Sequence, residues 1–243
     1  MFIDGIKLII DSHVHLGGPP KEAEPKTFAK LMKASKIEKA IIFRYFYEKP
    51  TVFSNRYISS VIKKFPNQYL GFAWVNPNEK TAPKELEESV TKWKLKGVKL
   101  HLEMHPTPLE KLRKIFNIAE KYSIPICIHL GNDFNQIKLL SKEFKVKLII
   151  AHLGTGVYCL DINRLKKAIE LAEDKKIFLE TSGNTYPLVN YALKALNPSK
   201  LIMGSDFPHE HPLVSVKIID LLNLSDENKE LILQKNISKI IGE

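Results

Sequence analysis

Residues 125–154 read PICIHLGNDFNQIKLLSKEFKVKLIIAHLG, and this stretch indicates the fold of the whole chain. It starts and ends with short apolar runs, 125–129 and 147–152, and each of these runs finishes on a histidine. The polar segment between them has the periodicity of a helix. A buried strand, a helix and a second buried strand make up the parallel βαβ unit. We therefore expect an α/β protein with a parallel sheet.

The same alternation continues in both directions from this unit. The segments 108–122 and 161–174 have helical periodicity, and Asp161 is a candidate N-cap for the second of them. One strand with its helix takes roughly 25 to 30 residues, the length of a βα module. Eight modules in 243 residues favour a (β/α)8 TIM barrel over a doubly wound sheet, since no GxGxxG follows the first strand. The predicted strands are 8–11, 39–43, 69–75, 97–100, 125–129, 147–152, 176–181 and 200–206.

Composition predicts one domain over residues 1–243, because a chain that is 44% hydrophobic can build one sizeable core. The final residues, 225–243, have a helical pattern with Ser225 as its cap, so we expect an extra helix after the barrel. The two cysteines cannot form a disulfide framework, which points to the reducing cytoplasm. The sequence shows neither a signal peptide nor an apolar run long enough to span a membrane.

The net charge of +10 raises the question of nucleic-acid binding. The lysines, however, are spread along nearly every helical segment and are not gathered into one block. We interpret this charge as solvated helix faces and expect a small molecule as the partner, with nucleic acid disfavoured. The loops of the compact chain are short, and this leaves open a homodimer in which a second subunit completes the site.

All eight histidines lie at or just after the ends of predicted strands. These ends form the active site in a TIM barrel, so the clustering predicts a site where a single histidine would more often be packed. His13 and His15 of DSHVHL are two residues apart, so their side chains share one face of a strand. Asp206 of GSDFP adds a carboxylate, and this set favours Zn²⁺, with Fe²⁺ or Mn²⁺ as alternatives. The other histidines are His101, His105, His129, His152, His209 and His211.

Together these motifs resemble the amidohydrolase superfamily, in particular the metal-dependent hydrolase branch that includes aminocarboxymuconate semialdehyde decarboxylase. The similarity covers DSHVHL, GFAWVNP, KGVKLH, PICIHLG, IIAHLG, LETSGN, GSDFP and KNISKIIG, nearly the whole chain. It implies one divalent metal ion, with ligands at His13, His15, His129 and Asp206. It also implies that His152 lies close to the metal-bound water and transfers a proton, while Asp206 orients that water.

The fourth strand leaves the number of metal ions open. Lys99 and His101 are two residues apart, so we expect both side chains to face the barrel interior, where they contact the substrate. In binuclear members of the superfamily a lysine at this strand is carboxylated and bridges two metals. The motif GVKLH resembles the branch with one metal. A structural alternative for Lys99 is a salt bridge with Asp11 inside the barrel.

Three activities follow from this site. The leading one is hydrolysis of a small amide, lactone or ester by metal-activated water. The alternative is non-oxidative decarboxylation, or a related lyase reaction, of an unsaturated or aromatic carboxylate, which Arg44 would help to bind beside an apolar wall of Tyr45 and Phe46. A TatD-like deoxyribonuclease is less favoured, because that group carries a glutamate metal ligand where this chain has GVKLH.

Overall fold

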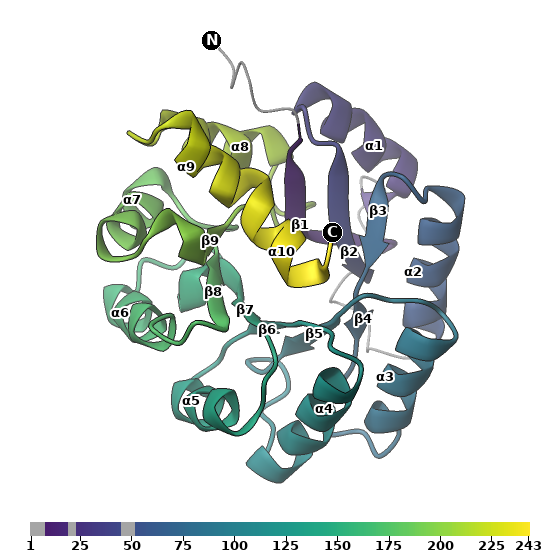
Figure 1. The fold of residues 1–243 in the computed structure, drawn as a ribbon. Helices are drawn as coiled ribbons and strands as arrows, with labels where there is room; N and C mark the ends of the chain where they lie inside the picture. Colours follow the sequence, from purple (N-terminus) through teal and green to yellow (C-terminus); the bar gives the residue numbers. More distant parts are fainter. Residues whose placement is uncertain (1–7, 19–22, 45–51) are drawn as a thin grey trace.

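The computed structural model describes residues 8–18, 23–44 and 52–243, and these form a barrel of parallel strands surrounded by helices (Figure 1). The strands are β1 (Ile10–Leu16), β2 (Lys39–Arg44), β3 (Tyr69–Gly71), β4 (Ala73–Trp74), β5 (Val98–His101), β6 (Ile126–His129), β7 (Leu148–Ile150), β8 (Ile177–Glu180) and β9 (Leu201–Ile202). Each strand pairing in the described chain is parallel. The predicted TIM-barrel architecture is confirmed.

The helices alternate with the strands and form the outer ring in Figure 1. They are α1 (Pro25–Ala34), α2 (Val52–Lys64), α3 (Ala82–Thr91), α4 (Leu109–Lys121), α5 (Phe134–Glu143), α6 (Ile162–Leu171), α7 (Tyr186–Ala195), α8 (Pro212–Leu221), α9 (Asp226–Glu230) and α10 (Asn236–Ile241). The predicted cap of α6 is confirmed, because the Asp161 side chain accepts a hydrogen bond from the backbone N–H of Arg164. No helix in the described ranges is long and apolar enough to cross a membrane.

Several predicted strands differ in extent from those in the structure, and the first, predicted over 8–11, runs from Ile10 to Leu16. The third, 69–75, is interrupted at Phe72, so it appears as β3 and β4 in two separate sheets. The backbone N–H of Phe72 still donates to Ile42 on β2, which keeps this part of the wall continuous. The last predicted strand, 200–206, is reduced to the two residues of β9. After β9 the chain leaves regular pairing, and this places Asp206 in an irregular segment.

Backbone hydrogen bonds join the first strand to the end of the last one. The N–H of His15 donates to Phe207 at 2.8 Å, and the N–H of Asp206 donates to His13 at 2.8 Å. A further bond runs from Ser12 to Met203 at 3.2 Å. These contacts hold two segments together that are almost two hundred residues apart in the sequence. The barrel seam therefore lies between the HxH motif and the GSDFP motif.

The C-terminal helix closes the end of the barrel opposite to the histidines. Figure 1 shows α10 lying across the opening of the strand ring. Ile237 and Ile240 of α10 pack with Ile10, Ile41 and Phe178 in one buried cluster inside the barrel. The predicted cap is confirmed, since the Ser225 side chain accepts from the N–H of Asn228 at the start of α9. The extra helix thus excludes water from the base of the barrel and leaves the other end for the site.

Candidate active site

Two histidines of β1 and the aspartate after β9 meet at one point. His13, His15 and Asp206 are all buried, and their ligand atoms lie within 4.8 Å of one another. The Nε2 atoms of His13 and His15 lie 3.3 Å and 3.2 Å from the same Asp206 Oδ1. Neutral imidazoles and a carboxylate without a thiolate are the donors that Zn²⁺ and related divalent ions accept in open catalytic sites. The residues present therefore fit the metal ion that the sequence predicts.

The other ring nitrogen of each β1 histidine has a partner outside this cluster. His15 Nδ1 donates to the backbone carbonyl of Arg44 at 3.0 Å, because a carbonyl oxygen can only accept. His13 Nδ1 lies 3.0 Å from Glu180 Oε2. Burial lowers the pKa of both histidines, so both rings are neutral near pH 7. A proton on Nδ1 leaves the Nε2 lone pair for a metal ion.

Asp206 is held as a carboxylate. Its burial alone would raise the pKa, but the neighbouring histidines, above all His15, lower the pKa to about 2. Asp206 also has a φ of +59°, a left-handed conformation that side chains other than glycine adopt uncommonly. Strained backbone of this kind persists where the surrounding structure fixes it, as it often does in active sites. Here the backbone bond to His13 supplies that constraint.

His152 lies at a sharp turn directly after β7. The predicted strand 147–152 ends at Ile150, and residues Ala151–Gly154 form a short 3-10 turn in which His152 has a φ of +56°. The ring of His152 lies 4.7 Å from the ring of His13, measured between centroids. Its Nδ1 contacts the carbonyl oxygen of Ser182 at 3.2 Å, so this nitrogen carries the proton. Burial keeps the pKa of His152 well below its usual value, and the ring is neutral.

His129, at the end of β6, stands beside the cluster but has its own partner. Its ring lies 4.7 Å from that of His152 and stacks on His101 at 4.0 Å. The stacking follows from the strand register, which pairs His101 with His129. His129 Nε2 lies 2.8 Å from a carboxylate oxygen of Glu103, outside the group formed by His13, His15 and Asp206. The role of His129 as a metal ligand stays a prediction.

Lys99 is buried inside the barrel and points into the site. Its Nζ lies 3.3 Å from His13 Nε2 and 3.8 Å from Cys127 Sγ, and the register of β5 and β6 pairs Lys99 with Cys127. The alternative, a salt bridge between Lys99 and Asp11, does not form. Asp11 Oδ1 accepts instead from the backbone N–H groups of His13 and Ser205. An ammonium group within reach of a site histidine can bind a carbonyl or carboxylate oxygen of a substrate.

The remaining two predicted substrate-binding residues lie further out. His101 stacks between His129 and Trp74, and its Nδ1 accepts from the N–H of Met104. Arg44 is partly exposed at the end of β2, where its guanidinium covers the ring of Tyr57 at 4.6 Å. The structure thus places Arg44 at the rim and His101 in the wall. The suggested apolar wall of Tyr45 and Phe46 falls outside the described residues.

Sequence reasoning missed Glu180, the last residue of β8. It is fully buried, and it contacts His13, Ser182 and the backbone of His152. Burial raises its pKa to about 8, while its hydrogen bonds act in the opposite direction. The sequence did contain a signal for Glu180, because it is a single acid at the end of the apolar run KIFLE. A charged group that is buried in this way needs hydrogen-bonding partners.

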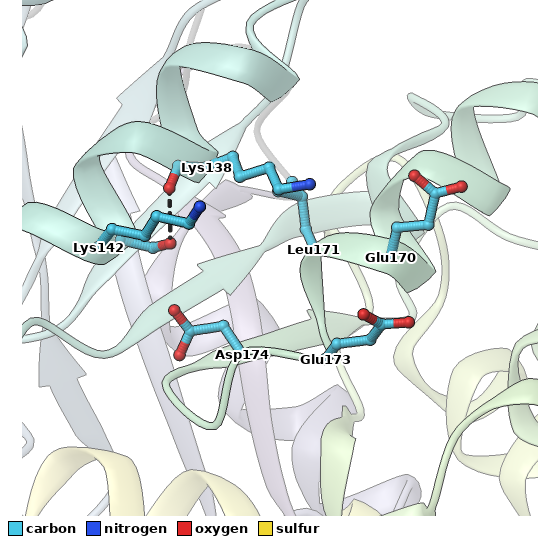
Figure 2. A pocket seen from close by; sticks show the side chains of 7 residues that line it. Lys138, Lys142, Glu170, Leu171, Glu173 and Asp174 are labelled. Carbon is cyan, nitrogen blue, oxygen red and sulfur yellow. Dashed lines mark hydrogen bonds between the residues drawn. The ribbon is translucent and has the colours of Figure 1, made fainter.

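A separate cavity of about 370 Å³ lies between α5 and α6. Figure 2 shows Lys138 and Lys142 on one side of it and Glu170 and Glu173 on the other. No histidine or cysteine lines this cavity, and none of the predicted site residues reaches it. Charged side chains that face water between two helices are ordinary surface structure. This cavity therefore offers no group of the predicted site.

Comparison with known proteins identifies the family. A family model described as amidohydrolase matches residues 10–242, nearly the whole chain. The chain belongs to the amidohydrolase family. The family match confirms the resemblance that the histidine and aspartate motifs of this amidohydrolase indicated. No curated protein gives a significant match.

Solved structures with the same fold cover this amidohydrolase almost completely. A protein from Acinetobacter baumannii, described as a probable 2-pyrone-4,6-dicarboxylic acid hydrolase, is 20% identical, with a TM-score of 0.77 over 97% of this chain and 99% of that one. A 2,6-dihydroxybenzoate decarboxylase is 15% identical, with a TM-score of 0.75 over 98% and 100%. The 5-carboxyvanillate decarboxylase of Sphingomonas paucimobilis is 12% identical, with a TM-score of 0.76 over 97% and 99%. At these identities the likeness establishes the fold.

The lowered histidine pKa values predict that the metal-free amidohydrolase loses stability in mild acid. Burial lowers the pKa of five site histidines below 6.5, so the unfolded chain binds more protons than the folded chain as the pH falls through 6.5. These histidines are His13, His15, His101, His129 and His152. Asp11 and Glu180 act in the opposite direction, because their pKa values are raised to about 7 and about 8.

Five groups outweigh two, so the free energy of unfolding is expected to fall between pH 6.5 and 4.5. Each unmatched proton contributes about 1.4 kcal/mol per pH unit. Urea unfolding in the presence of a chelator, at a series of pH values, measures this slope. A His152→Asn variant, which lacks one of the five groups, should show a shallower slope. A free energy that is constant or rises toward pH 4.5 would contradict the prediction.

Proposed function

We propose that this amidohydrolase hydrolyses a small amide, lactone or ester with water activated by one divalent metal ion. The observation that carries the proposal is the convergence of two histidine Nε2 atoms on one oxygen of Asp206 in a buried position. His13, His15, His129 and Asp206 would hold the ion, and Zn²⁺ suits these donors best. When bound, the ion supplies Lewis acidity and water with a pKa near ~7.

The side chains around this point can divide the remaining tasks. Asp206 stays ionised at neutral pH because of its low pKa, so it can orient a water molecule and accept its proton. His152 is neutral and lies against His13, where it can transfer a proton to or from the substrate. The Lys99 ammonium can stabilise the negative oxygen that develops on an attacked carbonyl. Arg44 at the rim can hold an anionic group of the substrate.

Decarboxylation of an unsaturated or aromatic carboxylate is the second candidate. It is favoured by the buried Lys99 ammonium, 3.3 Å from His13 Nε2, together with the Arg44 guanidinium at the rim. Two cations around a metal site suit a substrate that carries a carboxylate. In this reaction the carbon that loses CO₂ must gain a proton, which His152 would first accept on Nε2 from a water molecule and then pass to that carbon. The deoxyribonuclease stays the least favoured, on the sequence grounds given above.

Two substrates taken from the structural relatives can separate the candidates. Loss of the ring absorbance of 2-pyrone-4,6-dicarboxylate reports lactone hydrolysis, and CO₂ release from 2,6-dihydroxybenzoate reports decarboxylation. A panel of simple lactones, esters and amides extends the hydrolytic arm. We expect hydrolysis that a chelator abolishes and one equivalent of Zn²⁺ or Mn²⁺ restores. Release of CO₂ without any hydrolysis would favour the second candidate, and activity that survives complete metal removal would contradict both.

The metal content of a Lys99→Met variant should distinguish one metal from two. We expect one equivalent per chain by elemental analysis, unchanged in the variant, because Lys99 is not among the proposed ligands, although its Nζ lies 3.3 Å from His13 Nε2. Two equivalents that fall to one in Lys99→Met would instead indicate a carboxylated lysine bridging two ions. Lys147→Met is the matched control, since Lys147 is a partly buried lysine that contacts α10 at the other end of the barrel.

A further inference from the structure

Glu180 occupies a central position in the site without an assigned role. The side chain is fully buried. Its Oε2 lies 3.0 Å from His13 Nδ1, 2.8 Å from the hydroxyl of Ser182 and 3.3 Å from the backbone N–H of His152. Its Oε1 accepts from the backbone N–H of Ser182. The two backbone groups can only donate, and a carboxylate has the lone pairs to accept from all four positions.

The segment after β9 leaves room for the Glu180 carboxylate, because residue 204 is a glycine. A Cβ atom at Gly204, between β9 and Asp206, would lie 2.3 Å from Glu180 Oε1 and 2.8 Å from the Cβ of His13. Real Cβ atoms essentially never come so close to another heavy atom, so a larger residue at 204 would displace the carboxylate or the histidine. The glycine of the motif GSDFP thus makes room for Glu180 at the barrel seam. The position of the carboxylate is built into the fold.

The contact with His13 is the one with chemical consequences. The single ring proton of neutral His13 can be on Nδ1, facing Glu180, or on Nε2, which lies 3.3 Å from Asp206 Oδ1. A proton on Nε2 would point to Asp206, and His13 Nδ1 would then need a donor from Glu180. Glu180 Oε2, however, already accepts from the N–H of His152, and it lies within bonding distance of the Ser182 hydroxyl. A proton on His13 Nδ1, donated to Glu180 Oε2, satisfies all these groups at once, because His13 Nε2 can then accept from Lys99 Nζ at 3.3 Å.

The contact with His152 concerns the backbone. His152 lies in the short turn after β7, outside the regular strand, and Glu180 accepts its backbone N–H. Buried N–H groups without a partner are rare because each costs free energy. The same carboxylate therefore holds a β1 histidine by its side chain and the His152 turn by its main chain. Glu180 thus connects β1, which carries the proposed ligand His13, to the turn that carries His152, the proposed proton carrier.

We infer that Glu180 is the positioning residue of this site, which keeps the His13 proton on Nδ1 and anchors the turn that carries His152. As a result, the His13 Nε2 lone pair faces Asp206, where the proposed metal ion would lie. The inference rests on the proposed function only in its statement that the His13 Nε2 lone pair binds a metal ion. Carboxylates that orient a metal-binding histidine typically contribute 10- to 100-fold to metal affinity, roughly, when they are removed by mutation.

The tautomer of His13 can be measured without a substrate or a metal. In metal-free protein labelled with ¹⁵N in its histidine rings, NMR distinguishes a protonated ring nitrogen from one with a free lone pair. The His13 signals are assigned by their loss in a His13→Asn variant. We expect Nδ1–H for His13 in the unaltered protein. Nε2–H at this ring would overturn the inference, and this result does not depend on the folding of any Glu180 variant.

Three variants test the cause. Glu180→Leu removes every acceptor, and the His13 ring should lose its uniform Nδ1–H state while Zn²⁺ affinity, measured by competition with a chromophoric chelator, falls about 10- to 100-fold. Glu180→Gln can keep its carbonyl at the Oε2 position, so it should retain the tautomer. Ser182→Ala leaves the contact between Glu180 and His13 in place, so its His13 signal and its Zn²⁺ affinity should match those of the unaltered protein.

Two outcomes would overturn the inference. One is a Glu180→Leu protein with an unchanged His13 ring and unchanged affinity. The other is a second equivalent of metal that disappears in Glu180→Leu, because Glu180 would then be a ligand together with His13 and His152, which lie close enough for this. Absence of hydrolysis and decarboxylation would contradict the proposed function alone, since the tautomer and the metal affinity are read without turnover.

Discussion

Asp206→Asn is expected to lose both metal binding and catalysis. The substitution keeps the shape of the side chain but removes the negative charge that two histidine Nε2 atoms face at 3.3 Å and 3.2 Å. It also removes the group that we propose to accept a proton from water, a contribution of about 10²- to 10⁴-fold. The turnover number should fall by at least this factor, with the metal content well below one equivalent. Elemental analysis and the substrate panel measure the two effects.

The control for this prediction is a surface aspartate. Asp226 is exposed in the first turn of α9 and is not among the proposed ligands, so Asp226→Asn should leave metal content and turnover unchanged. The far-ultraviolet circular dichroism of both variants checks that the barrel is intact. If Asp206→Asn keeps a full equivalent of metal and its activity, the metal centre proposed at the barrel seam is wrong.

His152→Asn is expected to separate catalysis from metal binding. His152 is buried and close to His13, yet its Nδ1 is bound to Ser182, and we do not place it among the ligands of a single ion. Its loss should leave about one equivalent of metal in place and lower the turnover number by about 10²- to 10⁴-fold, the usual contribution of a general acid or base. The Michaelis constant should change much less than the turnover number.

The matched control is another histidine at the same end of the barrel. His211 caps α8 through a hydrogen bond from the N–H of Leu213, and asparagine is itself a good N-cap. His211→Asn should therefore keep its stability, metal content and turnover. A His152→Asn protein that loses its metal would show that His152 is a ligand. One that loses neither metal nor turnover would remove it from the mechanism.

The fold could be predicted because it depends on local patterns. Apolar runs such as 125–129 are strands because their side chains must be buried on both faces, and the segment 161–174 is a helix because of its periodicity and its cap. The ends of elements were less predictable. The strand predicted over 147–152 stops at Ile150, because the backbone of His152 adopts a positive φ that the identity of the residue does not indicate.

Local sequence patterns were enough to predict the barrel, the amidohydrolase motifs and the gathering of histidines at one end, because apolar periodicity and strand order act over short distances along the chain. The contacts between individual atoms depend on how the strands come together in three dimensions. Lys99 reaches His13 and not Asp11, and His129 faces Glu103. Glu180 joins His13 although 167 residues separate them. Such contacts depend on the stagger between strands, which is fixed only when the barrel closes.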